Sequence, residues 1–113
     1  MGASWGHALH PPDTFAEYEV GVQPVSIVPL ADVLHEAATL SKDARLLIKV
    51  NTEGEECPTV LGTPPASWAS VSEVLVETHP WATCGADELA AHLEAAGLKR
   101  VESAHARMLQ LRR

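Results

Sequence analysis

The stretch Leu46–Val50 constrains the fold of this chain most strongly, because it is a nearly unbroken apolar run that stops abruptly at polar residues. Its sequence, LLIKV, is typical of a parallel strand that is covered on both faces. Directly after it come an amide and three acids around Gly54, namely Asn51, Glu53, Glu55 and Glu56. Loops at strand ends carry polar groups without burying them in the sheet, so we expect this cluster at the carboxyl end of a strand.

Strand and helix patterns alternate along the chain after Pro24. The predicted strands are residues 25–28, 46–50, 74–76, 99–103 and 107–111. Helices are predicted at 30–40 and at 86–96, where Gly97 is the stop signal, and a short helical turn is predicted near 66–70. This alternation predicts a three-layer α/β sandwich with a largely parallel sheet.

The length of 113 residues is that of one domain with a single core. Residues 1–24 contain prolines and glycines but no helical or alternating period, so we interpret them as an irregular N-terminal arm. Residues 25–113 are then the α/β domain.

The net charge of −7 makes nucleic acid and anionic membrane surfaces poor partners, because the field of the whole molecule repels phosphate. Basic residues gather near the carboxyl terminus, where we interpret them as edge protection of terminal strands, with phosphate binding as the alternative: Lys99, Arg100, Arg107, Arg112 and Arg113. No signal peptide or membrane-spanning run is recognisable. We therefore expect a cytoplasmic protein in which Cys57 and Cys84 are free thiols.

A second polar cluster, Glu77 and His79, follows the predicted strand at 74–76. Parallel strands place their carboxyl ends on the same edge, so this cluster and the one containing Asn51 and Glu53 are expected to converge on one cleft. The alternative is that the acids at 53–56 only cap the helix that follows. Trp81 is expected either to wall the cleft or to lie in the core.

Four pieces of the sequence together resemble one enzyme family. The segment Lys49-Val50-Asn51-Thr52-Glu53-Gly54-Glu55-Glu56, with Val60-Leu61-Gly62 after it, is similar to the Lys-x-Asp-x-Glu-Gly-x-Glu and Val-Leu-x-Gly motifs of the FkbM-type S-adenosylmethionine-dependent methyltransferases. Residues 76–79 resemble the Val/Leu-Glu-x-His strand end of that family, residues 88–97 its closing helix, and residues 28–34 its Thr-Leu-Asp-Asp-Leu-Leu stretch. The resemblance covers residues 25–103.

The resemblance implies a Rossmann-like class I methyltransferase sheet, S-adenosylmethionine as cofactor, and methyl transfer to a hydroxyl of a small molecule or sugar. It implies His79 as the catalytic base, because histidine accepts protons near neutral pH, and Glu53 as a catalytic orienting group. The implied substrate-binding residues are Asn51, Glu56, Glu77 and Trp81.

The sequence departs from the family in two ways. Asn51 replaces the usual aspartate and removes a negative charge. The glycine-rich loop that follows a first strand in class I methyltransferases is missing, so the cofactor-binding residues stay unknown and the chain resembles the carboxyl-terminal half of such a domain.

Two other functions remain open from the sequence. A half sheet exposes a strand edge, which predicts a non-catalytic interaction module that forms a homodimer or complements another chain. A zinc site built from Glu53, Glu56, His79 and Cys84 is the weaker idea, since no paired spacing such as Cys-x-x-Cys is present, and we expect no metal.

Overall fold

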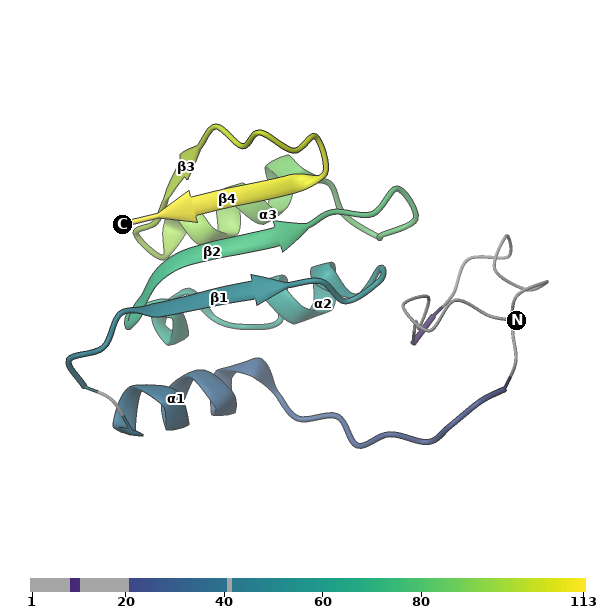
Figure 1. The fold of residues 1–113 in the computed structure, drawn as a ribbon, viewed down its shortest axis with the longest axis horizontal. Coiled ribbons are helices and arrows are strands. Elements are labelled where there is room, and N and C mark those ends of the chain that lie inside the picture. Colours follow the sequence, from purple (N-terminus) through teal and green to yellow (C-terminus); the bar gives the residue numbers. More distant parts are fainter. Residues whose placement is uncertain (1–8, 11–20, 41) are drawn as a thin grey trace.

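Four strands form one mixed sheet in the order β1-β2-β4-β3 (Figure 1). The computed structural model describes residues 9–10, 21–40 and 42–113. Within this part the strands are β1 (Leu46–Val50), β2 (Val71–Glu77), β3 (Lys99–Val101) and β4 (Met108–Arg112). β1 and β2 pair in parallel, whereas β4 pairs antiparallel with both β2 and β3. The sheet is therefore less parallel than predicted, because β4 runs against its neighbours.

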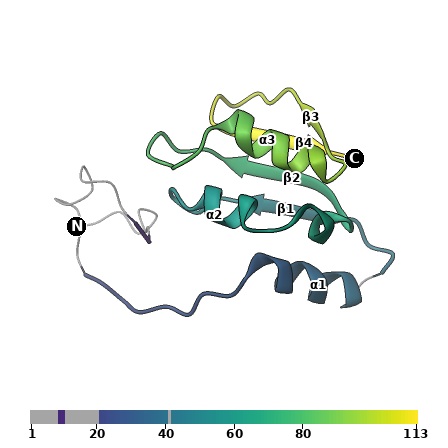
Figure 2. The ribbon, with the colours of Figure 1, turned by 180° about the vertical axis from the view of Figure 1, so that it is seen from behind.

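The helices lie between the strands in the chain: α1 (Leu30–Leu40), α2 (Glu56–Leu61), a 3₁₀ helix η2 (Pro65–Trp68) and α3 (Ala86–Ala95). Figure 2, seen from behind, places α2 and α3 in front of the sheet. These bounds confirm the predicted helices at 30–40 and 86–96 to within a residue and the predicted turn near residue 66.

One face of the sheet carries the core. Val74 and Val76 of β2 and Leu109 and Leu111 of β4 are buried against the helices. Side chains alternate between the faces of a strand, and Leu47 of β1, on the other face, is 58% exposed. Among the described residues the helices cover one face only, so the α/β domain has two layers where three were predicted.

The end of α3 explains why this helix was easy to recognise. Leu89 and Leu93 are buried on its inner side, and Asp87 lies in its first turn, where the helix dipole favours an acid. Gly97, with φ of 94°, follows the C-cap in the left-handed region that glycine adopts without steric cost. Local sequence therefore determines both ends of this helix.

The predicted strand at 25–28 is wrong. Residues 21–29 form no strand, and Ile27 is 76% exposed. Pro24 and Pro29 flank this segment and have no N–H to donate to a ladder, which disfavours strand pairing. The rest of the predicted arm, residues 1–8 and 11–20, lies outside the described residues.

Helix α1 packs against η2 through one side only. Leu34 is buried in the core, but Val33 is 46% and Leu40 79% exposed. Only part of the apolar face that predicted this helix is therefore buried within the described part of the chain.

No described helix has the length and apolar content needed to cross a bilayer.

Candidate functional site

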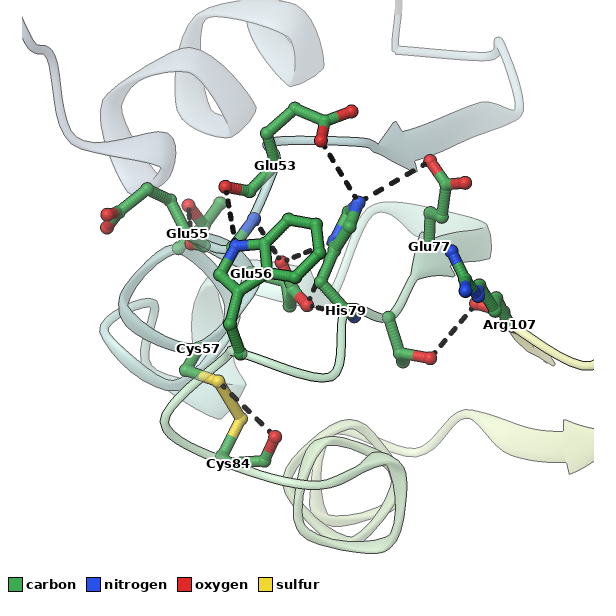
Figure 3. A network of polar contacts seen from close by, with 12 residues as sticks. Glu53, Glu55, Glu56, Cys57, Glu77, His79, Cys84 and Arg107 are labelled. Atoms are coloured by element: carbon green, nitrogen blue, oxygen red, sulfur yellow. Dashed lines mark hydrogen bonds and ion pairs between the residues drawn. A yellow bond between two sulfur atoms is a disulfide. The ribbon is translucent and has the colours of Figure 1, made fainter. Parts of the chain in front are cut away.

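The polar clusters that follow β1 and β2 meet at one edge of the sheet, as the sequence predicts (Figure 3). β1 and β2 end side by side because Val50 pairs with Val76 in a parallel register. The Nε2 atom of His79 lies 3.6 Å from Oε2 of Glu53 and 3.9 Å from Oε2 of Glu77. Two segments of the chain therefore contribute to one group of titratable side chains.

A buried carboxylate fixes the position of His79. Glu56 is fully buried and its Oε2 accepts a hydrogen bond from the backbone N–H of His79 at 2.7 Å. The Nδ1–H of the same residue donates to Oε1 and Oε2 of Glu56 at 3.1 and 3.2 Å. A further donor is the backbone N–H of Gly54, 3.1 Å from Oε1. These bonds compensate for the burial of a charge.

The same bonds determine which nitrogen of His79 carries a proton. A carboxylate only accepts hydrogen bonds, so Nδ1 is the protonated nitrogen of the neutral ring and Nε2 has a lone pair. The distances of 3.6 and 3.9 Å from Nε2 to the carboxylates of Glu53 and Glu77 exceed those of a hydrogen bond. The His79 side chain is only 4% exposed. Its free nitrogen therefore points at two acids without a hydrogen bond to either.

A tight turn after β1 places Trp81 over this histidine. Glu53 and Gly54 have φ of 50° and 103° in this turn. The carbonyl of Glu53 accepts a hydrogen bond from Nε1 of Trp81 at 3.3 Å, and the Trp81 and His79 rings lie 4.9 Å apart. A Cβ on Gly54 would lie 2.3 Å from Nε1 of Trp81, closer than two such atoms ever approach. Gly54 is thus required by both its backbone and its neighbour.

A disulfide links α2 to the loop that carries His79. Cys57 and Cys84 are bonded, with Cα atoms 5.8 Å apart, and are separated by 27 residues in the chain. The prediction of free thiols is therefore wrong, and Cys84 has no thiolate with which to bind a metal. Together with the Glu56–His79 hydrogen bonds, the bridge connects α2 to the 79–84 loop twice.

The remaining predicted site residues are less involved. Asn51 is exposed. Glu56, predicted to bind substrate, has no exposed surface and is occupied by His79, so its role in this structure is to position that ring. Glu55 does not cap α2 through its side chain and instead pairs with His10. The hydroxyl of Thr52 is buried without a hydrogen-bond partner among the described residues.

The cluster lies at the protein surface. Glu53 and Glu77 have side chains that are 21% and 31% exposed, so solvent reaches these two residues. Two surface hollows of about 240 and 310 Å³ are lined by other residues, at 45–47 with 72–73 and at 100–110. Neither hollow includes Glu53, Glu77 or His79, which lie at the carboxyl ends of β1 and β2.

Comparison of the chain with protein-family models, with curated proteins and with solved structures finds no match in any of the three.

Proposed function

We propose that this chain is the acceptor-side half of an FkbM-type S-adenosylmethionine-dependent methyltransferase, which methylates a hydroxyl of a small molecule or sugar. The observation that carries the proposal is the His79 ring, whose Nδ1–H donates to buried Glu56 while its Nε2 faces the partly exposed carboxylates of Glu53 and Glu77. A lone pair that is fixed in direction beside acceptor-binding groups is what a general base requires.

His79 in this role takes the proton of the acceptor hydroxyl at Nε2 as the oxygen becomes nucleophilic. The imidazolium that forms then has three carboxylates around it: Glu56 at Nδ1, and Glu53 and Glu77 at Nε2. Opposite charges at these distances stabilise the protonated ring, and the two exposed carboxylates also accept hydrogen bonds from the other hydroxyls of a sugar. Glu53 and Glu77 therefore suit orientation of the acceptor.

The order of the strands also supports the proposal. β1, β2 and β3 run in one direction, and the last strand, β4, is inserted between β2 and β3 in the opposite direction. A reversed last strand between the two preceding strands is the arrangement of the carboxyl-terminal half of a class I methyltransferase sheet. The finer prediction of an incomplete Rossmann-like domain, with a second helical layer on the open face, is part of this proposal.

The described residues do not fit the cofactor. S-adenosylmethionine supplies an electrophilic methyl group when bound, and class I enzymes hold it with a glycine-rich loop after a strand. Gly54, Gly62, Gly85 and Gly97 are isolated in turns and helix ends, and the described part contains no such loop. We therefore assign to this chain the general base, His79, and the groups that bind the methyl acceptor, Glu53 and Glu77. Cofactor binding is assigned to a complementing chain.

A methyl-transfer assay tests the proposal. The purified chain is incubated with tritiated S-adenosylmethionine and a panel of sugar and small-molecule hydroxyls, alone and after co-expression with a cofactor-side half that carries the glycine loop. We expect transfer only in the complemented sample, falling about 100-fold or more in His79→Gln, since a positioned base contributes about 10²–10⁴-fold. An unchanged rate in His79→Gln would remove the base, and no transfer by a folded, complemented pair would remove the methyltransferase assignment.

The second candidate is an interaction module without catalysis. It is favoured by the position of β1 at the edge of the sheet, with Leu47 exposed on its open face and Val33 and Leu40 exposed on α1. Such a surface suits a homodimer or a complementing chain. Light scattering of the purified chain tests this candidate: a dimer that Leu47→Lys dissociates supports it, and a monomer that recovers no partner counts against it.

A further inference from the structure

Glu53, Glu77 and His79 bring three potential metal ligands together. One carboxylate oxygen from each glutamate and Nε2 of the histidine all lie within 4.8 Å of one another. Glu53 follows β1, Glu77 ends β2 and His79 lies two residues further on, so the register of the parallel pair determines this spacing. The protein makes no hydrogen bond to this nitrogen among the described residues.

The spacing is close to that of a metal site. Two atoms bound at about 2.1 Å to one tetrahedral zinc ion lie about 3.4 Å apart. Nε2 of His79 is 3.6 Å from Glu53 and 3.9 Å from Glu77, only a few tenths of an ångström longer. Both glutamate side chains are partly exposed, whereas His79 is held by Glu56.

The negative charge of the three glutamates also favours binding of a cation. Glu53, Glu56 and Glu77 surround a single imidazole, and no lysine or arginine in the described part of the chain forms an ion pair with any of them. Nε2 of His79 and one carboxylate oxygen of each of Glu53 and Glu77 lie within 4.8 Å of one another, so a cation placed between them is attracted by all three groups.

The hydrogen bond from Nδ1 to Glu56 completes the pattern. A metal-binding histidine donates its second ring N–H to a carboxylate or carbonyl, which fixes the ring and raises the basicity of the ligating nitrogen. Glu56 does this from a fully buried position. The need to hold the ring explains why a buried acid, which is costly by itself, stands beside a surface site.

We propose that Glu53, Glu77 and His79 bind a divalent transition metal of the zinc type, with an open coordination position toward solvent. One imidazole and two carboxylates suit zinc, cobalt and manganese, and three protein ligands leave room for water or a substrate oxygen. The proposal does not depend on methyl transfer. A bound metal would use the same Nε2 lone pair that the proposed general base needs, so metal binding and proton acceptance by His79 exclude each other.

Cobalt(II) titration of the purified full chain tests the site, because four-coordinate cobalt has a strong visible ligand-field absorption. We expect one saturable site per chain, with affinity at least tenfold weaker in Glu77→Gln, which removes an exposed ligand and no internal hydrogen bond. Glu102→Gln is the matched control for loss of one negative charge away from the site. Glu55→Gln is the control for metal binding at the His10 pair.

The site of binding is read by NMR. Paramagnetic cobalt is expected to broaden the ring resonances of His79 before those of the other histidines. Equal affinity in wild type and Glu77→Gln, earlier broadening of another histidine, or no binding at millimolar cobalt would each overturn the proposal. Circular dichroism of each variant confirms that it is folded, and methyl-transfer activity is not needed for any of these readings.

Discussion

Replacing Glu56 by glutamine preserves the shape of the side chain but removes an acceptor from a pocket that supplies only donors. The two carboxylate oxygens accept from the N–H of Gly54, the N–H of His79 and Nδ1–H of the same ring. In the glutamine side chain an NH₂ group replaces one of the two oxygens, and it faces a donor in either orientation. The backbone N–H of Gly54 or that of His79 then loses its acceptor.

The size of the effect follows from the burial of Glu56. A hydrogen bond to a charged group contributes about 1.5–3 kcal/mol, and a buried donor without a partner costs about 1–3 kcal/mol. Part of this is offset because a neutral amide is easier to bury than a carboxylate. We expect Glu56→Gln to lower the free energy of unfolding by about 2–4 kcal/mol, which moves a urea midpoint by about 1–2 M if the m-value is about 2 kcal/mol/M.

Urea denaturation followed by the fluorescence of the tryptophans measures this change, with Glu102→Gln as the control for charge alone. Glu102 is exposed, so its replacement is expected to change stability by less than about 0.5 kcal/mol. A Glu56→Gln variant as stable as wild type, or more stable, would show that the hydrogen bonds to His79 are not the reason for burying this acid. It would thereby refute the claim that Glu56 holds the His79 ring in place.

Three further changes test the structure around the site. Reducing the bridge, or Cys57→Ser with Cys84→Ser, is expected to destabilise the fold by about 3–4 kcal/mol, because a bridge across 27 residues restricts the unfolded chain; equal denaturation curves with and without reductant would contradict it. Gly54→Ala is expected to cost about 2–4 kcal/mol and to alter the fluorescence of Trp81, whereas Gly21→Ala, in open space, is expected to be neutral. Arg113→Ala is expected to cost about 1–3 kcal/mol in thermal unfolding, because the guanidinium donates to the carbonyls of Val71, Trp68 and Ala96; a melting temperature equal to wild type would refute that role.

The parts of the fold that were predictable from the sequence are those that local pattern determines. The apolar run at 46–50, the stop at Gly97 and the acids in the first turn of α3 are signals within a few residues of the structure they specify. The direction of β4 was also accessible, because a short connection between consecutive strands makes them antiparallel. The strand expected at 25–28 does not form, because Pro24 and Pro29 at its ends have no N–H to donate to a ladder.

The site was predictable in outline only. The sequence brings Glu53, Glu77 and His79 to one edge because parallel strands end together. It does not reveal that Glu56 turns inward to His79, since that contact spans 23 residues and depends on the turn at Gly54. The disulfide was missed for a similar reason: two cysteines 27 residues apart carry no local sign of pairing, and the assumed compartment favoured thiols.

The tautomer of His79 tests the central claim most directly, because both the base and the metal ligand require a lone pair on Nε2. Long-range ¹H–¹⁵N correlation spectra of the metal-free chain at pH 8 distinguish the two ring nitrogens. For the neutral ring we predict the tautomer with the proton on Nδ1, where Glu56 accepts it, and a lone pair on Nε2 facing Glu53 and Glu77. A neutral ring that carries its proton on Nε2 would contradict both proposals at once.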